Sequence, residues 1–249
     1  MDNDKPHMGE RKKLRGRPRK QGIKSENPRE SILATAIKLF QERGYAKTSL
    51  SEIARQNGMD QSSLYYWFPS KEAILESIFD RNKLAPIPRI IHNREINEPY
   101  VIQLYLLIVS DVVTKCDLPF DFIELEGVAH QHPERFEYLF KDYRNRYQTM
   151  LRVLQEGIDV QEFIPCEADE RVVTILSVNE GLQHHYHAKK RGELILEASG
   201  YTVSNYTPES IGFLSAQTIL PSLATEPLDL LAIRARAQEI VKNLSGAEF

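Results

Sequence analysis

Apolar residues recur along the chain at the three- and four-residue spacing of amphipathic helices. In the segment 28–43 this spacing gathers five apolar side chains on one face, namely Ile32, Leu33, Ala36, Ile37 and Phe40. Three shorter segments of the same kind follow before residue 85. The period-two alternation that marks β-strands is almost absent, so the pattern predicts an all-α fold.

Polar capping residues and helix breakers separate these segments. A polar residue precedes each predicted helix, and a glycine or proline follows it. The expected caps are Asn27, Ser49, Asp60 and Ser70, and the expected breakers are Gly44, Gly58, Pro69 and the pair Pro86 and Pro88. The double proline ends the fourth helix, predicted over 70–84, and marks a natural domain boundary.

The remainder of the chain also has helical periodicity. Its predicted helices lie near 98–115, 119–131, 133–157, 168–191, 208–222 and 228–243. The stretch 192–206 fits the helical pattern least and is predicted to be an irregular loop. The expected organisation is a flexible basic arm over 1–24, a small helical domain over 25–84 and a larger helical domain over 85–249.

Charge divides the chain in the same place. Residues 1–84 carry 17 lysines and arginines against 11 aspartates and glutamates, whereas residues 85–249 carry 15 against 24. Seven of the ten residues from Arg11 to Lys20 are basic, and none is acidic. A basic first third on an acidic body indicates a polyanionic partner for that third alone.

Composition argues against several classes of protein. The most apolar stretch, 101–113, is too short for a membrane helix, and the polar N-terminus has no secretory h-region, so we expect a cytoplasmic protein. The two cysteines, Cys116 and Cys166, lack metal-type spacing. The sequence has no nucleophile elbow, phosphate loop or His-Glu-x-x-His motif, so we expect no catalytic residue and no cofactor.

The second and third predicted helices have the spacing of a helix-turn-helix. Ala54 is small enough for two helices to cross closely, Gly58 accepts the positive φ of the turn, and Leu64 anchors the next helix. That helix is rich in polar and tyrosine side chains, which suits a reader of base edges. The candidate DNA contacts here are Gln61, Ser62, Ser63, Tyr65, Tyr66 and Lys71. A capped surface helix is the alternative.

The basic arm contains the run Arg15-Gly16-Arg17-Pro18-Arg19-Lys20. Glycine removes bulk and proline keeps the chain extended, so Arg15, Arg17 and Arg19 fit the narrow minor groove of A·T-rich DNA. A solvated basic tail is the alternative. Homeodomains combine such an arm with a helix in the major groove, so the arm favours a DNA-binding function for the adjacent helix-turn-helix.

Residues 28–75 resemble the TetR family of bacterial transcriptional regulators. The resemblance, over about a fifth of the chain, rests on three motifs: Ala36-Ile37-x-Leu39-Phe40-x-x-x-Gly44-Tyr45, Thr48-Ser49-x-x-x-Ile53-Ala54-x-x-x-Gly58 and Ser63-Leu64-Tyr65-Tyr66-x-Phe68-x-Ser70-Lys71-Glu72. It implies an all-α repressor with an N-terminal DNA-binding domain and a C-terminal domain for ligand binding and dimerisation.

The resemblance also implies roles for single residues. Gln61, Ser62 and Tyr65 would contact bases, whereas Thr48, Ser63, Tyr66 and Lys71 would contact phosphates. Trp67 departs from the histidine or other phosphate-contacting residue that family members often have. Its indole N–H can donate to a phosphate, or its ring can simply pack.

The larger domain has polar and aromatic residues among apolar ones, which suits a ligand pocket between helices. The candidates are Asp111, Phe122, Tyr143, Arg144, Tyr147, Asn179 and Gln183, each with surface or core packing as the alternative. Aromatic residues between 136 and 147 suggest an aromatic or otherwise amphipathic effector. His184 and His187 share a helix face, but no nearby cysteine or acidic residue has the spacing of a metal ligand. We therefore expect an interface or pocket edge at His184, His185 and His187, and no metal site.

These patterns favour a ligand-responsive repressor of the nucleoid that a small-molecule effector releases from a palindromic operator in double-stranded DNA. One short helix reads too few base pairs alone, so a homodimer is expected. Its predicted contacts are Val172, Ile175, Leu176, Phe213, Leu214 and Ile219. The alternative is an architectural protein that binds any duplex through its arm.

Overall fold

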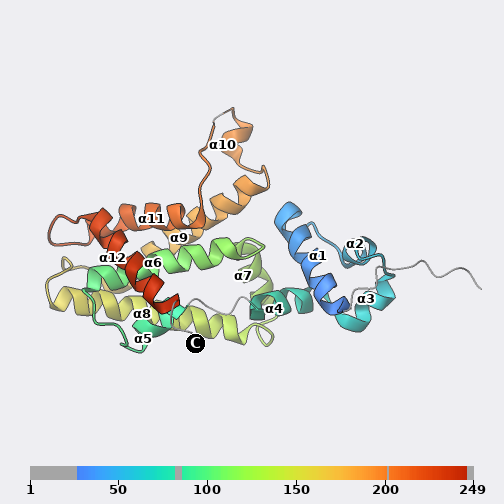
Figure 1. Cartoon of the computed structure of the whole chain (residues 1–249), viewed down its shortest axis with the longest axis horizontal. Coiled ribbons are helices and arrows are strands. Elements are labelled where there is room, and N and C mark those ends of the chain that lie inside the picture. The colour runs from blue at the N-terminus through green and yellow to red at the C-terminus, as the bar shows by residue number, and fades with distance from the viewer. Residues whose placement is uncertain (1–26, 82–85, 201, 246–249) are drawn as a thin grey trace, which may run out of the picture.

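The computed structural model describes residues 27–81, 86–200 and 202–245, most of which are helical (Figure 1). Within these ranges no β-strand forms, and the one β-bridge joins Phe163 to Ala224. The all-α prediction is therefore confirmed. In chain order the helices are α1 (Pro28–Arg43), α2 (Leu50–Gln56), α3 (Gln61–Trp67), α4 (Lys71–Arg81), α5 (Pro86–His92), α6 (Tyr100–Asp117), α7 (Phe122–Gln131), α8 (Glu137–Asp159), α9 (Ala168–Lys190), α10 (Ile195–Ala198), α11 (Pro208–Ile219), a 3-10 helix (Leu220–Ser222) and α12 (Leu230–Ser245).

The ends of the first helices follow the capping residues. Side-chain oxygens of Asn27, Ser49 and Ser70 each accept a backbone amide from the first turn of the following helix, at 3.2 to 3.3 Å. Gly58 in the α2–α3 turn has a φ of +66°, which side chains disfavour. Asp60 occupies the N-cap position of α3, but its carboxylate makes no capping hydrogen bond.

Two short helices differ from the prediction. α5 begins at Pro86, so the segment with Pro86 and Pro88 starts a helix and does not only end one. The fixed φ of proline suits the first turn of a helix. α10 interrupts the stretch that was expected to be an irregular loop. The arm over 1–24, with Arg15, Arg17 and Arg19, lies outside the described residues.

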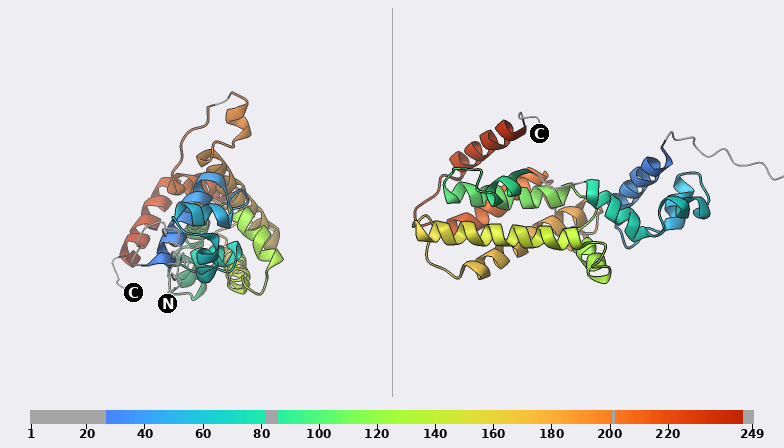
Figure 2. Two further views of the ribbon diagram at one scale, coloured as in Figure 1. Left: turned by 90° about the vertical axis from the view of Figure 1, so that its right-hand side faces the viewer. Right: turned by 90° about the horizontal axis from the view of Figure 1, so that it is seen from below.

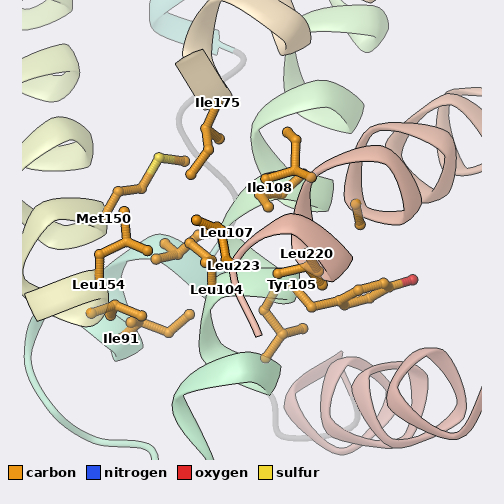
Figure 3. Packing of buried hydrophobic residues seen from close by; sticks show 14 of the residues in the cluster. Ile91, Leu104, Tyr105, Leu107, Ile108, Met150, Leu154, Ile175, Leu220 and Leu223 are labelled. Atoms are coloured by element: carbon orange, nitrogen blue, oxygen red, sulfur yellow. The ribbon is translucent and has the colours of Figure 1, made fainter. Parts of the chain in front are cut away.

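α6 forms the centre of the helical bundle, because it packs against α5, α8, α9, α11 and α12. Its near-continuous apolar sequence is typical of a helix surrounded by others. Figure 3 shows its side chains interleaved with those of the neighbouring elements: Leu104, Leu107 and Ile108 of α6, Ile91 of α5, Met150 and Leu154 of α8, Ile175 of α9, and Leu220 and Leu223 after α11.

Four predicted dimer contacts belong to this core instead. Val172, Ile175, Leu176 and Ile219 are at most 6% exposed within one chain. That part of the prediction is wrong, because the same faces of α9 and α11 are needed to cover α6. Leu214 remains on the outer surface.

A second core joins α1–α4 to the bundle. Its N-terminal members include Leu33, Phe40, Leu64 and Phe68, and its members from beyond α6 are Leu118, Phe120, Phe122, Leu125, Ala129, Phe136 and Leu139. Phe120 meets Phe40 edge-on, with ring centroids 6.4 Å apart. Figure 2 shows α1–α3 at one end of the molecule with α4 between them and the bundle. The N-terminal helices therefore share a hydrophobic core with the α6–α8 corner.

Gly212 allows α11 to approach α6 closely. A Cβ atom there would lie 3.0 Å from Val109 Cγ1 and 3.3 Å from the Val109 backbone. We expect Gly212→Ala to lower the free energy of unfolding by about 1–3 kcal/mol through overpacking. Urea denaturation of the pure protein measures this. Gly127→Ala in α7 is the matched control, because its Cβ would meet nothing within 4 Å and should be neutral or stabilising. Equal effects of the two changes would contradict the close-packing argument.

Candidate nucleic-acid interface and helical cavity

α3 presents a polar face to solvent because its apolar side buries Leu64 completely. Gln61, Ser62 and Ser63 are all exposed, and Tyr65 and Tyr66 are 46% and 83% exposed. Gln61 Nε2 donates to the Tyr65 hydroxyl at 3.2 Å, which pairs one turn of the helix with the next. These side chains form an outward surface of amide and hydroxyl groups suited to base edges and phosphates.

Trp67 sits at the end of this face and is 38% exposed. Its ring stands perpendicular to that of Tyr66, with centroids 5.3 Å apart. The indole both packs and remains accessible.

Two predicted phosphate contacts are turned inward. The Thr48 side chain is buried, and its hydroxyl donates to the Gly44 carbonyl at 3.0 Å, so the expected phosphate contact through that hydroxyl does not fit the structure. Lys71 Nζ donates to the carbonyls of Tyr45 and Thr48 at 2.8 and 3.0 Å and lies over the Tyr45 ring. Burial lowers the pKa of Lys71. Both residues thus brace the segment between α1 and α2.

A small cavity lies where α4, α7 and α8 meet the end of α6. Its volume of about 30 Å³ admits no more than a few waters. The predicted ligand residues Phe122 and Tyr143 line it, with nearly parallel rings 6.4 Å apart. The other lining residues are Phe79, Thr114, Lys115, Leu118, Tyr138, Leu139, Asp142 and Arg146.

A buried ionic network adjoins this cavity. The Asp111 carboxylate is fully buried and lies 2.8 Å from Arg146 and 3.4 Å from Lys115, while Asn179 Nδ2 donates to it at 2.9 Å. Burial alone would raise the pKa of Asp111, but the two cations, together with hydrogen bonds from Asn179 and Lys115, outweigh burial and lower it. Asp111 is therefore an internally neutralised anion.

Lys115 connects this network to the aromatic wall of the cavity. Its ammonium lies 3.4 Å from Glu180 and 4.3 Å from the centroid of the Phe122 ring. The Tyr143 hydroxyl donates to Glu180 at 3.1 Å, and burial together with this carboxylate raises the pKa of Tyr143. The Lys115 ammonium, the Glu180 carboxylate and the two aromatic rings therefore lie close together between α6, α7, α8 and α9.

Residues 32–78 match the family model described as bacterial regulatory proteins, tetR family. The chain contains a tetR-family domain. A segment of 65 residues is 38% identical to the HTH-type transcriptional regulator EthR of Mycolicibacterium smegmatis, covering 26% of this chain and 30% of EthR. The chain thus matches under a third of the length of that relative.

Solved structures extend the likeness to the whole fold. Mycobacterium smegmatis AmtR superimposes with a TM-score of 0.62 at 19% identity, over 91% of this chain and 98% of that one. AibR, in a complex with isovaleryl coenzyme A and operator DNA, gives 0.53 at 16% identity, over 78% and 99%. The tetR-family domain therefore sits on a C-terminal helical bundle with the same fold as in those two proteins.

Behind the tetR-family domain, the remaining predicted ligand residues lie in different environments. Arg144 is exposed on α8, which contradicts its expected place in a pocket, while Tyr147 packs against the α6 core. Asn179 and Gln183 are fully buried, and Gln183 Nε2 donates to Asp121 at 3.4 Å. Gln183 Oε1 has no hydrogen-bond partner among the described residues.

Arg146 and Lys115 are the charged residues of this network that the sequence analysis did not select. Arg146 lies two positions beyond Arg144, so it faces the opposite side of α8 and reaches Asp111. A signal was present in the sequence, because Lys115 follows Asp111 by four residues and Arg146 follows Asp142 by four. Opposite charges at that spacing share one helix face.

The histidines make contacts within the chain. His184 Nδ1 pairs with the Asp121 carboxylate, and His187 Nε2 lies 3.3 Å from the Lys115 carbonyl oxygen. Burial lowers the pKa of His187. Across the described ranges, no three residues of His, Cys, Asp or Glu gather as metal ligands, and no helix is long and apolar enough to cross a membrane.

Asp111→Asn should destabilise the bundle strongly. The change leaves Lys115 and Arg146 buried without their shared anion, which costs about 3–5 kcal/mol of unfolding free energy. Chemical denaturation at neutral pH checks this against Asp142→Asn, which removes a more exposed partner of Arg146 and should cost clearly less. A larger loss for Asp142→Asn would overturn the assignment of Asp111 as the centre of the network.

Proposed function

We propose that the chain is a homodimeric transcriptional repressor that a small-molecule effector releases from a palindromic operator. The observation that carries this proposal is the exposed polar face of α3, held outward by the buried Leu64 within a tetR-family domain. The resemblance in fold to AibR, which has been solved with operator DNA and a coenzyme A ester, supports both partners. Such a regulator works in the cytoplasm at the nucleoid.

In this proposal α3 lies in the major groove. Gln61, Ser62 and Tyr65 read base edges, since their amide and hydroxyl groups are exposed together. Ser63, Tyr66 and Trp67 approach the flanking phosphates. A seven-residue helix covers few base pairs, so two copies related by a two-fold axis are needed for a specific site. The outer surfaces of α9 and α11, with Val173 and Leu214, supply apolar contacts for that pairing.

Effector binding in the cavity must move α4. The cavity holds only a few waters, whereas ligand pockets commonly measure about 300–1,000 Å³. A ligand that stacks on Phe122 and Tyr143 therefore has to displace Phe79, the contribution of α4 to the wall. Because α4 continues directly from the helix-turn-helix, its displacement changes the separation of the two α3 helices in the dimer. The aromatic walls favour an aromatic or otherwise amphipathic effector.

A second link runs through α7. The Glu124 carboxylate accepts the backbone N–H of Tyr45 at 2.8 Å, in the segment between α1 and α2. Phe122, two residues earlier in the same helix, lines the cavity. A shift of α7 on effector binding would thus pull on the segment that precedes α2.

Selection of bound duplexes from a random DNA pool tests the function, and a palindromic consensus is the expected result. On that consensus, Gln61→Ala should weaken binding by about 1–3 kcal/mol and relax the preference at one base position in each half-site. Gln148→Ala, an exposed glutamine of α8, is the control and should change nothing. Recovery of unrelated sequences with equal affinity would reject sequence-specific repression and favour an architectural protein.

The basic arm, outside the described residues, makes a separate prediction. Arg17→Ala should weaken binding to every duplex and lower the slope of log affinity against log salt by about one for each phosphate that Arg17 neutralises. Titrations at several salt concentrations measure the slope. Lys141→Ala on the surface of α8 is the charge-matched control. If both variants keep the wild-type slope, the arm does not contact DNA.

A further inference from the structure

A second and larger opening lies between α6 and α12, on another side of α6 from most of the cavity described above. Its volume is about 450 Å³, within the range of small-molecule sites. The two openings share only Thr114 among their lining residues. Figure 2 shows α12 crossing the outside of α6 at an angle. We call this opening the α6–α12 groove.

The groove has an apolar floor supplied by successive turns of α6. Leu106, Val109 and Val113 fall on one side of that helix, and Tyr105 adds a ring that is only 4% exposed. Two hydroxyls, from Ser110 and Thr114, interrupt the apolar surface. A floor of this kind suits a flexible apolar chain laid along the helix.

The facing wall comes from a distinct stripe of α12. Ile233, Ala237 and Ile240 are buried against the bundle, which fixes the orientation of the helix. The adjacent stripe faces the groove and includes Arg234, Gln238, Val241 and Lys242. α12 thus docks through one stripe and lines the open groove mainly with the next, and Ala237 belongs to both.

Charge on this wall is positive and available. No carboxylate among the described residues lies within ion-pair distance of Arg234 or Lys242, and Glu209 is the one acidic residue of the lining. The Arg234 guanidinium lies 4.6 Å from the Phe213 ring centroid. Its charge also opposes the burial that raises the pKa of the neighbouring Tyr105. A half-buried guanidinium beside a phenol is suited to bind a carboxylate.

We propose that the α6–α12 groove binds a monomeric amphipathic anion, a carboxylate on an apolar chain. The carboxylate pairs with Arg234 and accepts from the Tyr105 hydroxyl, and the chain lies along Leu106, Val109 and Val113. A free molecule fits the groove between the two helices, whereas a bilayer surface would meet only its rim. The proposal is independent of the repressor function, because it uses neither α3 nor the aromatic cavity.

Titration calorimetry with decanoate, on the full-length chain, tests the site. We expect decanoate to bind with one site per chain, and decanol and decyltrimethylammonium to bind at least tenfold more weakly. Arg234→Gln should weaken decanoate binding at least tenfold. Arg236→Gln, which removes an exposed arginine of the same helix that pairs with Glu98, should leave it unchanged. Equal binding of all three probes, or equal effects of the two substitutions, would overturn the proposal.

A second pair of variants tests the chain-binding part of the groove. Val241→Asp places a negative charge in the lining and should abolish binding, whereas Leu231→Asp, at a 70% exposed position of α12 outside the groove, should not. Tyr138→Ala in the aromatic cavity should also leave decanoate binding intact. Loss of binding in Tyr138→Ala alone would place decanoate in that cavity and overturn the proposal. Binding to anionic phosphatidylglycerol vesicles without binding of free decanoate would overturn it as well.

Discussion

The packing of Phe120 against Phe40 is the contact on which the rest of the structure depends. α1–α4 are small elements that share their apolar core with residues from beyond α6. Residues from the α6–α8 corner complete their core, with Leu118, Phe120 and Phe122 all at most 5% exposed. Because Leu64 is buried in this core, the opposite, polar side of α3 faces solvent.

In the proposed function, the same core would couple a ligand in the small cavity to α3. Phe122 belongs to the core and also lines the small cavity, and the Lys115 ammonium lies over its ring. α4 contributes Phe79 to the cavity wall and Ile74 and Leu75 to the core. No separate relay is required, because the ring that an effector would touch already supports the N-terminal helices. The buried Asp111 network keeps the other side of the cavity rigid, since its charges are mutually satisfied.

Local rules recovered much of the fold from the sequence. Caps at Asn27, Ser49 and Ser70 and the turn at Gly58 are set by neighbours within a few residues, so they were predictable. The long helices followed from their apolar spacing. The outward polar face of α3 followed from the single buried anchor Leu64.

The errors arose where distant residues decide the environment. Thr48 is buried in a segment whose carbonyl accepts from Lys71 of α4, 23 residues later, and its neighbours in the sequence do not distinguish that position from an exposed one. Arg144 and Arg146 differ only in which side of α8 meets α6. Val172 and Ile175 are apolar, which suits a core and a dimer interface equally well. Their burial within one chain could be predicted only by knowing where α6 lies. Short helices such as α5 depend on packing more than on their own sequence.

Amide hydrogen exchange on the intact chain carrying Phe120→Ala tests the shared core most directly. The account predicts that protection falls together in α1 and in the α7–α8 region, while α9 and α11 keep their wild-type protection. Loss of protection confined to the α6–α7 corner, with α1 unchanged, would show that the N-terminal helices are stable by themselves and would contradict the account.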